Sequence, residues 1–516
     1  MKNIMNKKDI REYIKKSKWS ILIVVLFILL SFGQRLISSS YSIDVEHYIH
    51  NLGVNTANWT WWNSLSRWGL VMINKLALFN SFPIYASNYL AVITMIIYSF
   101  MFNYLFYCYI KEDYEDAFLK YQFIFPIIFV TSPIFAEQYN FIHQSFGVAL
   151  GILMIPVSII IIDRASEIDN KYLKLFYYLI GISITVLCFG VYQSIILLYI
   201  VTVASCYLLK VIKDKDNNWM FLLKKVIIFL ISILLYLTIS KVVSESSSYL
   251  NMAWKDGNIL QCLKNIYYCI KDIIISNSMY YNIGYIIALI LTLVLFINLI
   301  VKKEIKIGMI LGAFAILTAP FYIMIITGED QLKRTQFNYS YTIGFILMIV
   351  MVFIQKLKKK EIFSIIGLAI VIYVAYIQSY ISSNLFYTSD VVFQNDIIIA
   401  NKIVSEIENK EWYDSGTEYE LIIIGAYTSD IKNVYIKGEI IGYSFFDFDY
   451  ENAWGVSARA NIFINNLGYK FKQATTEDFY EAKKYVEENS IKSWPSKDSI
   501  ILMKENKIVV RLSESL

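Results

Sequence analysis

Long apolar runs separated by short polar segments dominate the first three quarters of the chain. Between Trp19 and Ile381, runs of about 20 residues carry almost no charge. A helical run of this length matches the hydrocarbon thickness of a bilayer, so the pattern predicts about 11 membrane-spanning helices. We expect them at residues 19–37, 84–110, 119–135, 141–162, 175–190, 192–212, 222–243, 280–301, 307–327, 337–355 and 362–382.

The pattern changes from about residue 384 to that of an ordinary polar domain. The spacing of its apolar positions predicts an amphipathic helix over 394–412, and the run Leu421-Ile-Ile-Ile424 predicts a short buried strand. The remaining patterns predict a small α/β domain over 384–516. They comprise a strand over 434–448, a helix over 477–488 with Thr476 as N-cap, and a hairpin over 499–512 that turns at Glu505-Asn506.

Composition agrees with a membrane protein and excludes a soluble enzyme. Hydrophobic residues make up 57% of the chain and charged residues 17%, against roughly 45–50% and about 25% in soluble proteins. Lys and Arg concentrate in residues 1–18 and in every second loop, and positive charge is retained in the cytoplasm. We therefore predict a polytopic α-helical protein with a cytoplasmic N-terminus, a membrane domain over 19–383 and an extracytoplasmic C-terminal domain.

The outer face should carry the function, because it holds the long segments. The loop over 38–83 contains Asp44 and Glu46, which would point the same way in an extended segment. Such a pair can deprotonate an acceptor hydroxyl, or bind a divalent cation such as Mg²⁺ or Mn²⁺ that bridges a phosphate. The alternative is an ordinary solvated loop. His47 beside the pair can move a proton or can be structural.

Cations are scarce on the predicted outer face. Arg67 in the first outer loop has a planar fork that suits a phosphate or a carboxylate, although a lone interfacial Arg also commonly snorkels. Lys333 and Arg334 are candidates to hold a lipid phosphate. Their alternative role is a surface ion-pair network with the neighbouring Glu329 and Asp330, which would contribute little stability.

Polar and aromatic residues near the same membrane boundary can line a substrate pocket. Glu137 and His143 flank a predicted outer turn, where buried polar groups cost free energy unless they face a cavity or a partner. Trp62 belongs to a cluster of aromatics typical of a membrane interface. No nucleotide-binding loop, zinc-ligand spacing or nucleophile elbow is present. An outward-facing enzyme without nucleotide sugars must take its donor from the lipid phase.

These features together resemble the membrane-embedded GT-C glycosyltransferases, and more narrowly the Gtr-type glucosyltransferases. The family pattern usually has Gly before the arginine, where this chain has Ser66. The resemblance covers most of the chain through short motifs. They are Ser42-Ile-Asp-Val-Glu46, the stretch from Trp62 to Gly69 with Arg67, Ser444-Phe-Phe-Asp447, Arg459, Asn466-Leu-Gly468, Trp494-Pro495 and Ile508-Val-Val-Arg-Leu512.

The resemblance implies an inverting transfer of a hexose, with glucose expected, from a polyprenyl phosphate to a cell-envelope polysaccharide at the bacterial plasma membrane. Asp44 or Glu46 would be the base, and Arg67, Lys333 and Arg334 would hold the donor phosphate. His47, Trp62, Glu137, His143, Glu329 and Asp330 would belong to the substrate pocket. The alternatives are a lipid-linked sugar flippase, an envelope scaffold protein, or a polysaccharide polymerase or ligase. No cofactor other than a divalent cation and no nucleic acid is expected.

Overall fold

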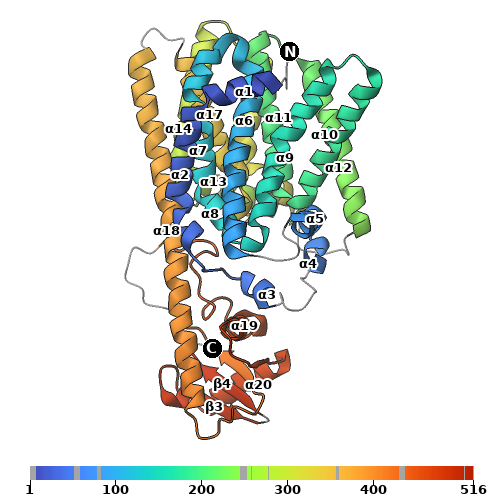
Figure 1. Cartoon of the computed structure of the whole chain (residues 1–516). Helices are drawn as coiled ribbons and strands as arrows, with labels where there is room; N and C mark the ends of the chain where they lie inside the picture. Colours follow the sequence, from blue (N-terminus) through green and yellow to red (C-terminus); the bar gives the residue numbers. More distant parts are fainter. Residues whose placement is uncertain are drawn as a thin grey trace.

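The computed structural model describes residues 7–50, 59–77, 83–243, 253–256, 258–276, 278–355, 360–428, 436–504 and 506–514. A bundle of long helices forms one end of the molecule, and a small α/β domain forms the other (Figure 1). The N-terminal helix α1 (Lys7–Lys16) lies at the end of the bundle far from that domain. The chain is thus a mostly helical membrane protein with a small sheet.

Within these residues, ten helical segments are long and apolar enough to cross a membrane. Helix α17 is almost wholly buried at the centre, whereas α12 is mostly exposed at the periphery. The segments are α2 (Lys18–Ile37), α6 (Ile84–Tyr121), α9 (Ile142–Glu167), α10 (Lys171–Val191), α11 (Ser194–Asp214), α12 (Trp219–Val243), α14 (Ile283–Val301), α15 (Ile307–Thr318) with α16 (Tyr322–Thr327), α17 (Phe337–Ile354) and α18 (Lys360–Glu408).

The expected span over 119–135 corresponds to no single helix. Its residues divide among the end of α6 and two short helices, α7 (Ile124–Thr131) and α8 (Pro133–Tyr139). Ser132 interrupts the run with an extended ψ of 134°, and Pro133 then starts α8 at a position that needs no intrahelical N–H. Every residue of α8 is buried. The break therefore delivers the polar end of α8 into the interior.

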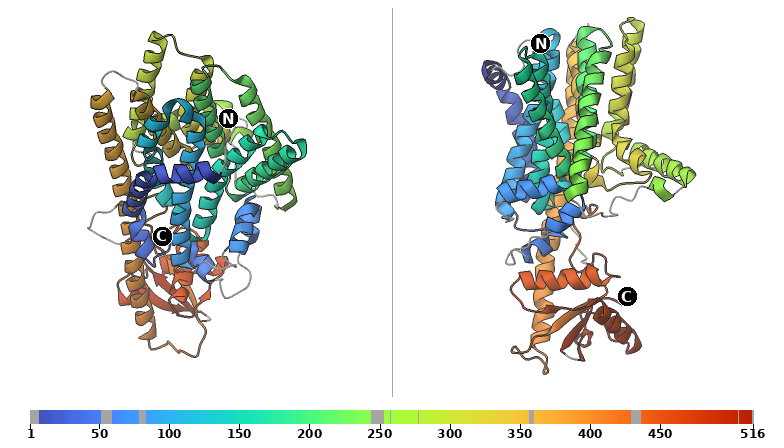
Figure 2. Two further views of the ribbon diagram at one scale, coloured as in Figure 1. Left: turned by 45° about the horizontal axis from the view of Figure 1, so that its top comes forward. Right: turned by 90° about the vertical axis from the view of Figure 1, so that its right-hand side faces the viewer.

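Helix α18 connects the two parts of the molecule without interruption. It is 49 residues long and contains both the expected span over 362–382 and most of the expected helix over 394–412. The boundary expected at residue 384 falls inside it. Figures 1 and 2 show α18 running from the bundle into the C-terminal domain.

The C-terminal domain is a four-stranded sheet covered by helices on both faces. Strand order is β2-β1-β4-β3, with β1 parallel to β2 and β4, and β3 antiparallel to β4. Leu421 and Ile423 face α18 and α19, while Ile422 and Ile424 face α20. The elements are β1 (Glu420–Ile424), β2 (Lys472–Gln473), β3 (Ile500–Met503), β4 (Lys507–Arg511), α19 (Ala458–Asn466) and α20 (Thr476–Glu488).

Most local predictions for this domain are confirmed, and two are wrong, the N-cap at Thr476 and the strand over 434–448. The strand at 421–424, the helix at 477–488 and the hairpin are present, although Thr475 rather than Thr476 caps α20 through a capping box with Asp478. Residue Glu505 of the expected turn lies outside the described residues. Residues 436–448 form loops and turns instead of a strand; residues 434 and 435 are not described.

Candidate active site

The segment after α2 is held in place by buried hydrogen bonds. Arg35, near the end of α2, donates from Nη1 to the Ser40 carbonyl at 2.8 Å and from Nη2 to the Asn140 carbonyl at 3.1 Å. Ser42 Oγ donates to the same Asn140 carbonyl at 3.0 Å. The chain then turns at Asp44, whose φ of 75° is left-handed, and enters α3 (Val45–His50). Residues with such backbone angles concentrate at functional sites.

Asp44 and Glu46 meet at one guanidinium. Arg459 in α19 donates from Nη2 to Asp44 Oδ1 at 2.8 Å and from Nη1 to Glu46 Oε1 at 2.5 Å. The two carboxylates differ in environment, because the Asp44 side chain is 45% exposed and the Glu46 side chain is fully buried. The two carboxylates therefore converge on one arginine of the C-terminal domain, although the chain turns at Asp44 into α3 and is not extended as we expected.

Burial sets the protonation behaviour of Glu46 and His47. Desolvation raises the pKa of Glu46 to about 7, against the opposing effect of Arg459, and the Asp44 charge raises it further. Glu46 Oε2 is buried without a hydrogen-bond partner. His47 lies 3.6 Å from Glu46 Oε1, and desolvation together with Arg459 lowers the pKa of its imidazole to about 4. His47 is therefore neutral at physiological pH.

A cavity of about 440 Å³ opens beside Asp44. Asp44 is its only acidic lining residue among the described part of the chain, and three arginines surround it. Glu46 and Glu439, behind the lining, pair with Arg459 and Arg334, and the guanidinium groups that line the cavity suit an anionic ligand next to a single base. The lining comprises Asp44, His47, Tyr48, Trp61, Trp62, Leu65, Arg67, Phe141, His143, Gln144, Tyr192, Arg334 and Arg459.

Close helix packing positions Arg67. It lies between α4 (Trp59–Ser64) and α5 (Trp68–Ala77), and a Cβ added to Gly69 would lie 2.7 Å from backbone atoms of α10. The Arg67 guanidinium stacks over Tyr192 at 4.5 Å, and Nε is 3.4 Å from Gln193 Oε1. Ser66 before it has a left-handed φ of 59°. Glycine adopts that conformation without steric cost, whereas serine does so at some cost.

Aromatic rings form another wall of the cavity. The His143 ring stacks on Tyr48 at 4.3 Å and on Trp62 at 5.5 Å, with interplanar angles of 15° and 17°. Flat, partly apolar faces of this kind suit the C–H face of a pyranose ring. The Arg334 guanidinium is stacked over Phe141 at 5.0 Å, and the Phe141 ring lies 5.9 Å from the His143 ring.

Comparison with known proteins identifies the chain. The family model described as "Glucosyl transferase GtrII" matches residues 33–352, which is more than half of the chain. This protein belongs to the glucosyl transferase GtrII family. No curated protein and no solved structure matches the chain. Membership makes this GtrII protein a glycosyltransferase, and Asp44, Arg67 and Arg334 all lie within the matched residues.

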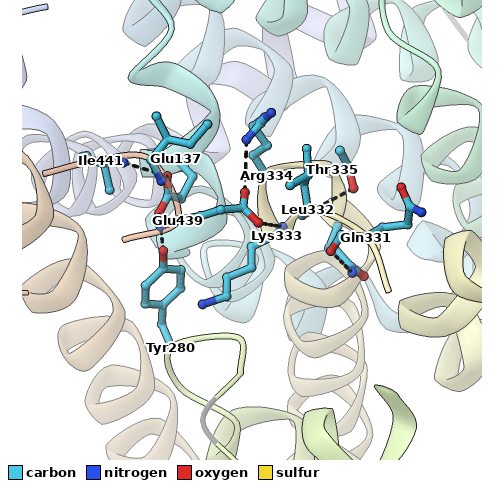
Figure 3. Close-up of polar contacts among 11 residues, drawn as sticks. Glu137, Tyr280, Gln331, Leu332, Lys333, Arg334, Thr335, Glu439 and Ile441 are labelled. Carbon is cyan, nitrogen blue, oxygen red and sulfur yellow. Dashed lines mark hydrogen bonds and ion pairs between the residues drawn. The ribbon is translucent and has the colours of Figure 1, made fainter. Parts of the chain in front are cut away.

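The candidates Glu137, Lys333, Glu329 and Asp330 of this GtrII protein are not among the residues that line the cavity. Figure 3 shows the contacts of Glu137 and Lys333. Glu137 is buried and accepts hydrogen bonds from the Tyr280 hydroxyl and from the backbone N–H groups of Glu439, Ile440 and Ile441. Lys333 Nζ lies over the Tyr280 ring at 4.5 Å. Glu329 accepts a hydrogen bond from Gln331 Nε2 of its own loop. Asp330 accepts from the Gln331 N–H and also contacts Cys269.

Arg459 is the residue of the candidate site for which the sequence predicted no role. It lies 415 residues from Asp44 in sequence and outside the family match, so local patterns could not connect the two. The only indication of Arg459 in the sequence was its place among the short motifs between residues 444 and 512 that carry the family resemblance. The Arg459 guanidinium also occupies the space between the two carboxylates that we considered as ligands of Mg²⁺ or Mn²⁺. Among the described residues, no group of three or more His, Cys, Asp or Glu could hold a metal ion. The arrangement does not fit a divalent cation.

Proposed function

We propose that this protein transfers glucose from a polyprenyl phosphate to a cell-envelope polysaccharide at the outer face of the bacterial plasma membrane. Family membership supports glycosyl transfer. The observation that carries the finer proposal is the cavity, where one exposed carboxylate faces three arginines at the end of the bundle nearest the C-terminal domain. A phosphate-linked sugar beside an acceptor hydroxyl needs this distribution of charge.

Asp44 is the base in this mechanism. Its carboxylate takes the proton of the acceptor hydroxyl while the hydroxyl oxygen forms a bond to the anomeric carbon. The bond between that carbon and the phosphate oxygen breaks on the opposite face, so the configuration inverts. The bond electrons stay with the polyprenyl phosphate, which leaves without a proton. Glu46 is buried behind Asp44 and holds Arg459 rather than the acceptor.

Arg67 and Arg334 receive the leaving phosphate. Both guanidiniums are stacked on aromatic rings and line the cavity, so they are oriented before the ligand arrives. Preorganised cations stabilise charge that develops in the transition state without a cost of reorganisation. The sugar then packs against the aromatic rings of Tyr48, Trp62 and His143.

The proposed orientation places the N-terminus in the cytoplasm and the cavity outside. It is supported by the concentration of Lys and Arg in one set of loops and by the position of α1 opposite the C-terminal domain. On that side a lipid-linked donor is available and nucleotide sugars are not. The C-terminal domain, next to the cavity, faces the acceptor polysaccharide.

Replacement of Asp44 tests the mechanism. Asp44→Asn keeps the shape of the side chain and removes its basicity, so transfer of radiolabelled glucose from polyprenyl phosphate should fall about 10²- to 10⁴-fold in proteoliposomes. The control is Asp169→Asn, which alters an exposed carboxylate in the loop between α9 and α10. Near-normal transfer by Asp44→Asn would contradict the assignment, and translocation of the donor without a new glycosidic bond would identify a flippase.

A further inference from the structure

Helix α13 (Ile259–Ile275) leaves the bundle sideways. Figure 2 (right) shows it projecting from the end of the bundle near the C-terminal domain. The Asn258 side chain caps its first turn by accepting from the Gln261 N–H at 3.1 Å. Its last turn is held by Asn282, which donates to the Asp272 carbonyl at 3.0 Å. Hydrogen bonds therefore hold both ends of the helix, so α13 is a well-defined helix and not an irregular loop.

Three different faces run along α13. The first packs on the protein, where Cys262 lies against Gly328 at the end of α16. The second is apolar and exposed, and the third is polar and exposed. The protein-facing residues are Cys262, Cys269 and Ile273; the apolar face exposes Ile259, Leu260, Leu263 and Tyr267; the polar face carries Gln261, Lys264, Tyr268, Lys271 and Asp272. Ile275, at the end of the helix, is exposed as well.

The level of α13 along the bundle indicates what covers its apolar face. The helix is joined to Asn282, where α14 begins, and to Gly328, where α16 ends. It therefore lies where two apolar segments reach the end of the bundle. Helix α14 also exposes apolar side chains, including Ile283 and Ile290. Lys264 and Lys271 border the apolar face, where their stems can lie on lipid and their ammonium groups can reach phosphates.

We propose that α13 is an interfacial helix that binds the lipid surface of the leaflet in contact with the active-site end of the bundle. Its apolar face lies among the acyl chains and its polar face lies in water, with the two lysines at the headgroups. The partner is the phosphate-bearing membrane surface itself.

The same contacts link the leaflet to the cavity. Asn265 of α13 donates to the Gly328 carbonyl at 3.3 Å, and Gly328 begins the loop that ends in Lys333 and Arg334. Tyr280, just beyond α13, lies under Lys333 and bonds Glu137 (Figure 3). The position of α13 in the leaflet thus sets the height of Arg334 above the lipid. This step rests on the proposed function, because Arg334 is there a contact of the donor phosphate.

Two adjacent tyrosines give a matched test of the lipid contact. Tyr267 is 62% exposed on the apolar face and Tyr268 is 57% exposed on the polar face. All five native cysteines are buried, so Tyr267→Cys and Tyr268→Cys can each be labelled selectively with an environment-sensitive fluorophore in phosphatidylglycerol liposomes. We expect brominated lipid to quench the probe at 267 and aqueous iodide to quench the probe at 268.

Two results would overturn the lipid contact. Equal quenching of both probes by iodide would place α13 in water. A probe at 267 that is shielded from both quenchers and becomes accessible on dilution of the protein would show that a second copy covers this face. Neither readout depends on catalysis, so this experiment tests the lipid contact independently of the proposed function.

The link to the donor is tested by charge at the same two positions. Tyr267→Asp should raise the apparent KM for polyprenyl-phosphate glucose about tenfold and leave kcat within about twofold, because it lifts α13 from the lipid without touching the cavity. Tyr268→Asp should leave both constants unchanged. If the two variants have the same apparent KM and kcat, while the unsubstituted protein in the same preparation transfers glucose, α13 does not influence binding of the donor.

Discussion

At the scale of single residues, the spacing of Asp44 and Glu46 predicted a shared site but not the difference between the two. The sequence places them two residues apart, and either could be the base. Their environments separate them, because Asp44 lines the cavity and Glu46 is buried with Oε2 unpaired. That difference depends on α19, which covers Glu46 only after the C-terminal domain has folded and docked. No local pattern contains this information.

Glu46 should make the stability of the protein depend on pH. Its pKa rises from 4.5 to about 7 on folding, so the folded protein binds more protons than the unfolded protein between these values. Stability therefore falls as pH rises through this window, by an amount on the order of 3 kcal/mol. Glu46→Gln cannot titrate and should reduce the slope, and the slope that remains comes above all from Asp396, whose pKa burial raises to about 8. The apparent Tm, followed by tryptophan fluorescence from pH 5 to pH 8 at one scan rate, measures it.

The control for this measurement is Glu481→Gln, which changes an exposed carboxylate on α20. It should reproduce the wild-type slope. A Glu46→Gln protein whose Tm still falls over this window as in the wild type would show that another group is responsible.

At the scale of elements, hydropathy located the apolar segments and failed where long-range polar contacts decide the structure. The pattern over 119–135 predicted one helix, whereas Ser132 and Pro133 divide it. The pattern over 434–448 predicted a strand, whereas the described part is a loop that bonds the buried Glu137 through three backbone N–H groups. These N–H groups find a carboxylate instead of a neighbouring strand, and the carboxylate comes from about 300 residues away.

Gly438 is the residue that allows this loop to approach Glu137. A Cβ at this position would overlap the Glu137 carboxylate and the Ile441 side chain. Gly438→Ala should therefore destabilise the protein by about 1–3 kcal/mol and loosen the loop that brings Glu439 to Arg334. The measurements are the apparent Tm and the hydrogen exchange of a peptide that covers 436–441.

Gly416→Ala is a matched control in the same domain, because the nearest atoms to its Cβ lie at an ordinary contact distance of 3.6 Å. It should leave both quantities unchanged. Wild-type exchange at 436–441 in the Gly438→Ala protein would mean that Glu137 does not anchor the loop.

At the scale of the whole molecule, both parts were predictable and their junction was not. Apolar runs indicated the membrane bundle, and mixed polarity indicated the α/β domain. No local pattern indicated that α18 would run unbroken between them, or that three ion pairs of the described residues would cross the junction. Arg459 holds Asp44 and Glu46, and Glu439 holds Arg334. The candidate site is therefore composite, with its carboxylates in the family-matched part and their arginine outside it.

Arg459 should therefore be required for transfer as a positioning residue. Its planar fork reaches two carboxylates at once, which a lysine ammonium cannot match. Arg459→Lys should lower kcat on the order of tenfold with little change in donor KM, because the donor contacts at Arg67 and Arg334 remain. Arg459→Ala should lower kcat further and also reduce stability by about 3–5 kcal/mol, since it leaves Glu46 buried without a cation.

A control variant separates the effect of Arg459 on the position of the two carboxylates from its effect on folding. Arg164→Lys changes an arginine–glutamate pair at the other end of the bundle, where Arg164 Nη1 lies 3.3 Å from Glu167, and should leave kcat unchanged. The amount of folded protein is taken as the fraction that stays monodisperse in detergent. A lower kcat per folded molecule then shows an effect on the candidate active site and not on folding. If Arg459→Lys retains wild-type kcat while its folded fraction is normal, the carboxylates do not need a shared guanidinium. The C-terminal domain would then act on the acceptor alone.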